Sequence, residues 1–140
     1  MFPKHITPES INAWNKNTLI EHIGIEFTEI GNGFLIARMP VDNRTHQPMG
    51  LLHGGASVAL AETIGSVGSH LIAQQNGDAA VGLDINANHV GGIKFGWVYG
   101  KGVLLHQGKT THVWEIRITD ENEKLICISR LTMMIIKGKK

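Results

Sequence analysis

The sequence predicts an α+β fold in which an antiparallel sheet of about six strands curves round one long central helix. Two observations carry this prediction. An almost wholly apolar stretch runs from about residue 54 to 75, and six strand-like segments flank it, two before and four after. The strand-like segments on each side are joined by short turns, so neighbouring strands must pair antiparallel. No other part of the chain could cover so apolar a helix, and the sheet therefore has to wrap it.

Length and composition indicate one globular domain over residues 1–140. Hydrophobic residues make up 42% and charged residues 18% of the chain, which is typical of a folded domain. The net charge of +1 gives no electrostatic reason to expect nucleic acid or an anionic membrane as a partner. The one cysteine, Cys127, lies between two isoleucines and is predicted to be a buried strand residue.

Targeting signals are not evident. The N-terminus has no apolar signal-peptide core. We find no apolar run that approaches the roughly 20 residues of a membrane span. We therefore expect a cytoplasmic protein without a membrane partner.

The N-terminal segment is predicted to be helical. Thr7 is a suitable N-cap, Pro8 fits the first turn and Gly24 ends the helical stretch. Its predicted packing residues are Ile11, Trp14, Leu19, Ile20 and Ile23. Strands follow at 25–30 and 34–39, joined by a Gly-Asn-Gly turn, and Pro40 is expected to end the second strand.

A polar loop over 41–52 leads into the long helix, which is predicted to run from about Gly54 to Gln75 and to end at Asn76-Gly77. Apolar residues lie on nearly all its sides, which predicts burial on all sides. Four more strands are expected at about 79–91, 95–106, 109–119 and 124–136.

Glu62 is the one acid inside this apolar helix. Carboxylates are rarely buried without a partner or a function. Ser66 follows one turn later on the same face, where a carboxylate and a hydroxyl together could hold a water molecule. The structural alternatives are an exposed or ion-paired Glu62 and a Ser66 that serves only helix packing.

The start of the helix supplies hydrogen-bond donors. Gly54 and Gly55 leave N–H groups unpaired at the positive end of the helix dipole, and Gln47 and His53 are polar groups on the preceding loop. Such donors polarise a carbonyl, which a carboxylate can attack or hydrolyse through water. The pattern therefore indicates acyl transfer or hydrolysis, although the glycines could serve close packing and His53 could be only a cap.

Helix geometry predicts that this site is shared between two subunits. Gly54 and Glu62 are eight residues apart, or about 12 Å along a helix axis, too far for one carbonyl to contact both. Two antiparallel helices in a two-fold dimer would bring them together. We expect Gln47, His53 and Gly54 from one subunit to act with Glu62 and Ser66 from the other.

These motifs resemble those of hotdog-fold acyl-CoA thioesterases. The resemblance rests on Gln47-Pro48-x-Gly50-x-Leu52-His53-Gly54-Gly55 and Ala61-Glu62-Thr63-Ile64-Gly65-Ser66, and further segments extend it over nearly the whole chain. It is nearest to the branch of 4-hydroxybenzoyl-CoA thioesterase and 1,4-dihydroxy-2-naphthoyl-CoA hydrolase, within the PaaI-like superfamily.

The resemblance implies roles for these residues. Glu62 would be nucleophile or general base, the Gly54 amide would polarise the thioester carbonyl with help from Gln47 and His53, and Ser66 would position the water or the acyl group. It also implies a dimer of dimers, that is a homotetramer, that needs no metal or cofactor. The residues expected to border or hold CoA are His89, Gly55, Val90, Lys94 and Arg130.

The sequence departs from the family pattern after His89. Val90-Gly91-Gly92-Ile93 follows, where members often carry a basic residue suited to a CoA phosphate, so Lys94 or Arg130 would have to supply the charge. The resulting prediction is hydrolysis of an aromatic acyl-CoA to the acid and CoA, with 1,4-dihydroxy-2-naphthoyl-CoA as a candidate substrate. The alternatives are a hotdog acyl-CoA hydratase or dehydratase and a non-catalytic acyl-CoA-binding protein.

Overall fold

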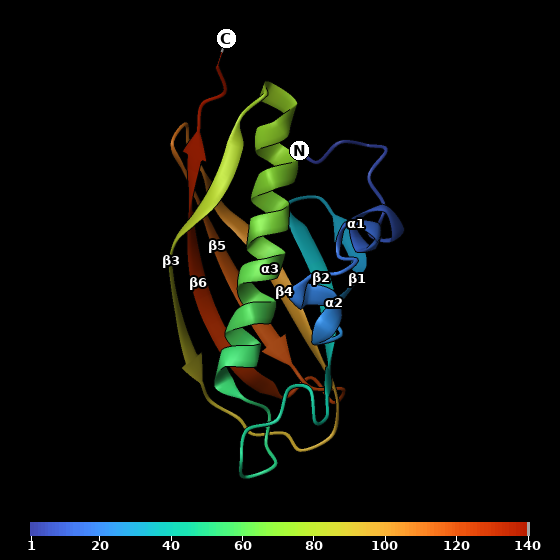
Figure 1. The fold of residues 1–140 in the computed structure, drawn as a ribbon. Coiled ribbons are helices and arrows are strands. Elements are labelled where there is room, and N and C mark those ends of the chain that lie inside the picture. The colour runs from blue at the N-terminus through green and yellow to red at the C-terminus, as the bar shows by residue number, and fades with distance from the viewer. Residues whose placement is uncertain (140) are drawn as a thin grey trace.

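The computed structural model describes residues 1–139 and confirms the predicted architecture of one sheet around one long helix (Figure 1). Its elements in chain order are α1 (Pro8–Trp14), α2 (Leu19–His22), β1 (Glu26–Gly31), β2 (Phe34–Val41), α3 (Gly54–Ala73), the 3₁₀ turn η1 (Gln74–Asn76), β3 (Ala79–His89), β4 (Gly96–Gln107), β5 (Thr111–Thr119) and β6 (Leu125–Ile136).

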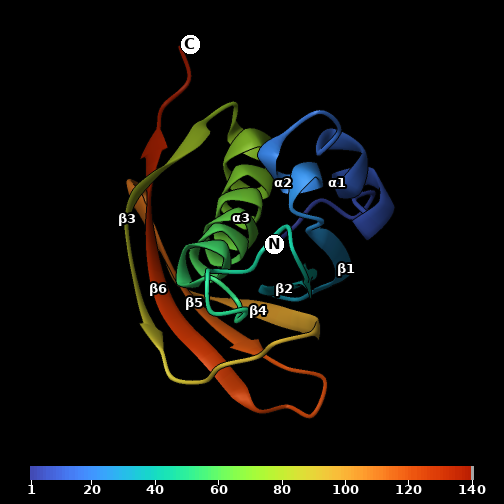
Figure 2. The same cartoon turned by 60° about the horizontal axis from the view of Figure 1, so that its bottom comes forward.

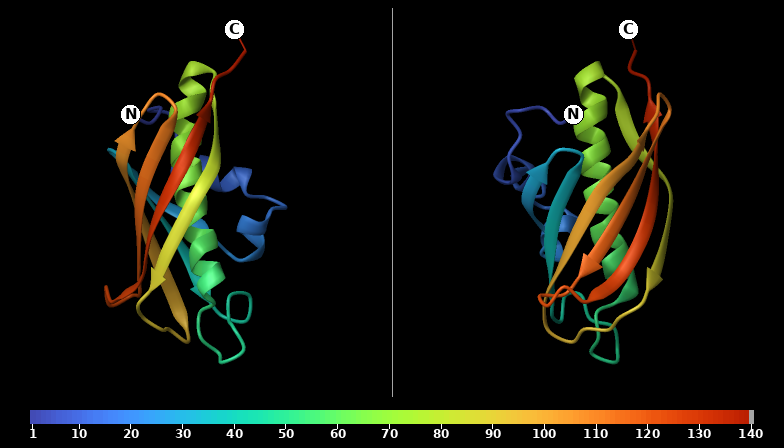
Figure 3. Two further views of the ribbon diagram at one scale, coloured as in Figure 1. Left: turned by 90° about the vertical axis from the view of Figure 1, so that its left-hand side faces the viewer. Right: turned by 180° about the vertical axis from the view of Figure 1, so that it is seen from behind.

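The six strands form one antiparallel sheet in the order β1-β2-β4-β5-β6-β3, so β1 and β3 are its edges. The sheet curves round α3, as the tilted view of Figure 2 and the side and back views of Figure 3 show. Glycines on α3 permit this close approach. A Cβ added at Gly65 would lie 2.4 Å from Leu131, and one at Gly68 would lie 2.4 Å from Trp114.

The helix is not buried on all sides in the single chain, contrary to the sequence prediction. Leu60, Ala61 and Ile64 are fully buried against the sheet. The opposite side of α3, including Ala59 and Glu62, is only half-buried, because the sheet covers one side and leaves the other open (Figure 2). An all-round apolar helix with one open side predicts a further partner for that side.

The apolar length of this helix also exceeds our sequence expectation. By length and composition alone, the segment Gly54–Asn76 could cross a membrane. Its most apolar stretch is 56% buried inside the fold, so the helix serves here as the core that the sheet wraps.

The N-terminal helical stretch is divided into α1 and α2, which the sequence did not predict. Asn17 adopts a left-handed conformation at φ 62° and breaks the helix between them. Ile11 is buried as expected, but Trp14 and Leu19 are 46% and 65% exposed. The prediction that these two pack into the core is therefore wrong.

Pro40 does not end β2, which continues to Val41. The register explains why proline is tolerated there. β1 begins at Glu26 opposite Arg38, so it does not reach Pro40, while β4 pairs with Pro40 through Trp97. At this point β2 is an edge strand, so the N–H that proline lacks is not needed for a hydrogen bond to a neighbouring strand.

Candidate active site

The start of α3 presents one free backbone donor. His53 is the N-cap, and its Nδ1 accepts a hydrogen bond from the Gly55 N–H at 2.7 Å. The Gly54 N–H has no acceptor among residues 1–139. Of the two glycine donors that the sequence singled out, only Gly54 is therefore available to a ligand in this structure. The bond from Gly55 also leaves the proton of a neutral His53 on Nε2.

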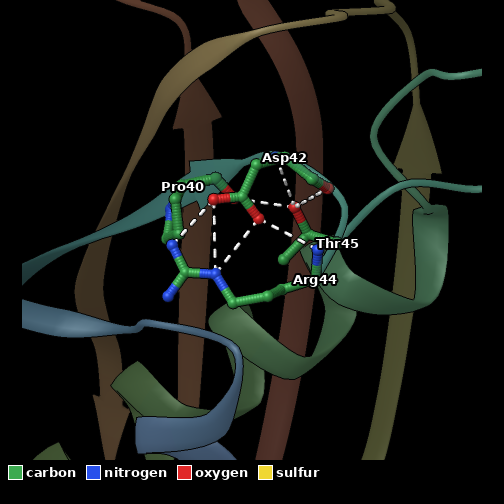
Figure 4. A network of polar contacts seen from close by, with 4 residues as sticks. All are labelled: Pro40, Asp42, Arg44 and Thr45. Carbon is green, nitrogen blue, oxygen red and sulfur yellow. Dashed lines mark hydrogen bonds and ion pairs between the residues drawn. The ribbon is translucent and has the colours of Figure 1, made fainter.

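The loop before α3 is held by the polar network in Figure 4. Thr45 is buried, and its hydroxyl donates to the Pro40 carbonyl at 2.7 Å. Arg44 pairs with Asp42 at 2.7 Å, and this hydrogen-bonded guanidinium lowers the pKa of the Asp42 carboxyl. The Thr45 carbonyl then accepts from the His53 N–H at 2.8 Å, so the network fixes where the helix begins.

Gln47 lies on the same loop and is half-buried. Its backbone N–H donates to the Leu51 carbonyl at 2.8 Å, and its side-chain oxygen accepts from the Met49 N–H. These bonds fold the loop back toward the helix start. Because the oxygen is used in this way, the NH₂ is the side-chain group of Gln47 that is left to donate to a ligand.

The C-terminal end of β3 meets the start of α3. The His89 ring packs against Gly54, where an added Cβ would lie 3.0 Å from Nε2. The following loop is joined to the Gln47 loop, because the Lys94 carbonyl accepts from His46 Nε2 at 2.6 Å. Val90 and Lys94 are both exposed. Gly54, His89 and these two residues thus gather where α3 begins and β3 ends, and these two ends lie at the bottom of Figure 1.

Glu62 and Ser66 lie farther along the helix, in a mostly apolar groove of about 450 Å³ between α2 and α3. Glu62 is half-buried and forms no ion pair within residues 1–139, so the ion-paired alternative for it is wrong. The Ser66 hydroxyl donates to Met133 Sδ at 3.7 Å. The groove is lined by Leu19, Ile20, Gly55, Val58, Ala59, Glu62, Thr63, Ser66 and Val67.

The structure therefore divides the predicted site into two groups within one chain. Glu62 contacts β3 at Gly82, whereas Gly54 contacts it at His89, seven residues farther along the strand. Leu19 and Ile20 form one wall of the groove. Ile20 also packs against the core, as the sequence predicted, whereas Leu19 is exposed. An exposed leucine beside a lone helical acid is a signal that becomes visible only once the fold is known.

Arg130 does not join either group. Along β6, Ser129 and Leu131 are buried toward the helix, and the exposed Arg130 between them points to the outer face of the sheet. It lies opposite Glu115 in the strand register. In one chain Arg130 therefore cannot act with Glu62 or Gly54, and Lys94 is the nearer of the two predicted cations.

The described residues hold no cluster of three or more His, Cys, Asp or Glu side chains that could bind a metal. Cys127 is fully buried, as the sequence predicted, and burial raises the pKa of its thiol. A raised pKa keeps the thiol protonated and unreactive.

Comparison with known proteins identifies the family. A model of the family described as the thioesterase superfamily matches residues 49–127, more than half of the chain. The chain belongs to the thioesterase superfamily. It is 51% identical to a putative esterase of Vibrio cholerae over 97% of this chain and 90% of that protein. It is 46% identical to the proofreading thioesterase EntH of Cronobacter turicensis over 97% and 98% of the two chains.

This thioesterase also has close structural relatives. The crystal structure of a thioesterase from Haemophilus influenzae superposes with a TM-score of 0.94 at 43% identity, covering 99% of this chain and 96% of that one. The predictions of the hotdog fold and of a thioester hydrolase are confirmed. The narrower resemblance to naphthoyl-CoA and hydroxybenzoyl-CoA enzymes stays a prediction.

Proposed function

We propose that this thioesterase hydrolyses an aromatic acyl-CoA to the free carboxylic acid and CoA. One observation supports the proposal most directly. Helix α3 carries a free N–H donor at Gly54 and, in an apolar groove, the carboxylate of Glu62, which has no ion-pair partner among residues 1–139. The Gly54 N–H donates to the thioester carbonyl oxygen and stabilises the charge that develops there. Glu62 attacks the carbonyl carbon or takes a proton from an attacking water. The C–S bond breaks, and CoA leaves as the thiolate and is then protonated. Where Glu62 attacks directly, water then hydrolyses the acyl–Glu62 anhydride, which releases the acid and restores the carboxylate.

The surrounding residues complete this scheme. Gln47 and His53 donate to the carbonyl oxygen or the departing sulfur, and Ser66 orients the water or the acyl group. His89, Val90 and Gly55 border the path of CoA, with Lys94 as the cation for a phosphate. No metal or cofactor enters the reaction, because N–H donors and a carboxylate supply both polarisation and attack.

The groove supports the choice of acyl group. Its volume of about 450 Å³ lies in the range of small-molecule sites, roughly 300–1,000 Å³. Its walls are mainly aliphatic, with Glu62, Thr63 and Ser66 along one side. An aryl ring suits such a slot.

A two-fold dimer along β3 would unite the two halves of the site. β3 is an 11-residue edge strand with exposed Val81 and Leu83, and a long exposed edge is a template for pairing. Antiparallel pairing centred near Ile85 and Asn86 would place the partner's His89 opposite Gly82. The partner's Gly54 would then approach Glu62, and the open sides of the two α3 helices would lie side by side. We propose this dimer as the catalytic unit, assembled in pairs as a homotetramer in the cytoplasm.

The first test is to incubate the protein with benzoyl-CoA and to measure free thiol. Release of thiol that depends on Glu62 supports the proposal. Binding without release would instead indicate an acyl-CoA-binding protein. A change at the double bond of an enoyl-CoA without thiol release would indicate a hydratase or dehydratase.

The shared site has its own test. Glu62→Ala and His53→Ala chains are each expected to be nearly inactive, and they are mixed after reversible unfolding. Random pairing gives half heterodimers with one intact site each, so the mixture should recover about a quarter of wild-type activity. A mixture no more active than its components would show that each site is built within one chain.

A further inference from the structure

We propose that Gly82 is a positioning residue, whose missing side chain sets where the Glu62 carboxylate rests. A Cβ added at Gly82 would lie 2.5 Å from Oε1 of Glu62 and 3.6 Å from its Cδ, and it would meet no other atom within 4 Å. The space beside Gly82 is thus filled by this carboxylate alone. The inference rests on the proposed role of Glu62 in thioester hydrolysis.

A β-bulge in β3 lies directly beside this contact. The register of β3 with β6 shifts between Gly82 and Asp84, so Leu83 is an extra residue that bulges out of the ladder. Gly82 itself pairs with Met133, and the Met133 sulfur receives the Ser66 hydroxyl. One strand pair therefore faces both polar side chains of the groove. Bulges re-aim the chain locally and are frequent beside active sites.

Alanine at Gly82 is expected to move the carboxylate and leave the fold intact. Gly82 does not have a positive φ, so alanine fits the backbone. The clashing atom is the end of a flexible side chain, and it reaches ordinary contact at about 3.5 Å by moving about 1 Å. A displacement of this size at a catalytic group can lower the rate by roughly 10²-fold.

The test is a double-mutant cycle with Glu62→Asp. The aspartate carboxylate is withdrawn by one methylene and no longer reaches Gly82. In the protein that has Glu62, we expect Gly82→Ala to lower kcat about 100-fold. In the Glu62→Asp variant, the same substitution should lower kcat less than about 3-fold. KM and the melting temperature should change little. An equal loss in both backgrounds, or no loss beside Glu62, would overturn the inference.

Two further measurements separate positioning from a general effect on the strand. Ala79→Ser is the control on the same strand, because Ala79 is exposed at the start of β3 and lies outside the proposed site, and it should retain wild-type kcat. Sedimentation of the Gly82→Ala protein should show the wild-type oligomer; a change of oligomer would assign the loss to assembly and contradict the proposal.

The same data distinguish this inference from the proposed function. If the wild-type protein releases no thiol, or Glu62→Ala keeps the wild-type rate, the proposed function fails. If Glu62→Ala is inactive and Gly82→Ala is as fast as wild type, only the role of Gly82 fails.

Discussion

At the scale of single residues, the core contains a hydrogen-bonded histidine, His112, whose protonation affects stability. The Ser69 hydroxyl oxygen accepts from Trp114 Nε1 at 2.8 Å, and its proton can be donated to His112 Nδ1 at 3.0 Å. All three residues are buried. Burial lowers the pKa of His112, and the positive form is disfavoured further by His106. His112 therefore serves as a neutral acceptor in the folded protein.

This environment predicts a loss of stability in acid. His112 binds a proton more weakly when folded, so its contribution is complete above the unfolded pKa near 6.5 and is lost as the pH falls toward the lower folded value. The free energy of unfolding in urea, measured between pH 8 and 5.5, should fall by at most about 1.4 kcal/mol per pH unit from this group. His112→Asn should flatten the slope; a variant with the same slope as the wild type would contradict the assignment.

Glu62 gives the second prediction at this scale. Glu62→Gln keeps the size of the side chain but removes its negative charge, so the fold should be retained while kcat falls by about 10²–10⁴-fold. Steady-state kinetics with benzoyl-CoA and a thermal melt measure the two quantities together. A kcat close to that of the wild type would rule out a carboxylate mechanism.

At the scale of secondary-structure elements, α2 forms a wall of the groove, while its Ile20 also packs against the core. Leu19 is 65% exposed and lines the groove opposite the Glu62 side of α3. The segment lies outside residues 49–127, which the family model matches. We expect its residues to influence which acyl group the groove accepts.

Filling the groove from α2 should change specificity. Leu19→Trp is expected to lower kcat/KM about 10-fold more for a naphthoyl-CoA than for a short aliphatic acyl-CoA, since even one methylene of pocket space is worth about 1–3 kcal/mol. A panel of acyl-CoA substrates measures this directly. Leu105→Trp, at a leucine 51% exposed on β4, is the control and should affect all substrates alike; the same pattern in both variants would show that α2 does not select the acyl group.

At the scale of the whole molecule, two surfaces that lack a partner lie next to each other. The open side of α3 leaves Glu62 partly exposed, and β3 beside it is an unpaired edge. Each surface needs a partner for a physical reason, one for apolar burial and the other for backbone hydrogen bonds. A second copy placed along β3 satisfies both at once.

Charges on this edge should therefore abolish both assembly and catalysis. Val81→Lys with Leu83→Lys is expected to give a folded monomer with at least about 10²-fold lower activity, because lysine on an edge strand opposes pairing and the site would lose its second half. Analytical ultracentrifugation and thiol release measure the two effects. Val103→Lys with Leu105→Lys alters residues of similar exposure, 37% and 51% against 39% and 58%, and should keep the dimer. An active monomer would disprove the shared site.

Much of this protein was predictable from local sequence signals. Glycine turns and alternating residues placed β3–β6 within about two residues, and the apolar run with its Asn76-Gly77 end placed α3. The candidate polar residues Glu62, Ser66, Gly54 and His53 were visible because they interrupt or begin this helix. Such features depend on neighbours in the chain, which the sequence lists directly.

Other features depend on contacts between distant segments, and only the tertiary structure decided them. Pro40 is tolerated in β2 because β1 starts too late to cover it, and the Gly54 N–H is the free one because His53 turns back to Gly55. In the sequence Gly82 looks like an ordinary strand glycine, and only the fold shows that it lies beside the Glu62 carboxylate. Sequence patterns determine which elements form and which residues carry chemistry. Packing in three dimensions decides which of those groups lie together, because register, burial and hydrogen-bond partners are set by residues far apart in the chain.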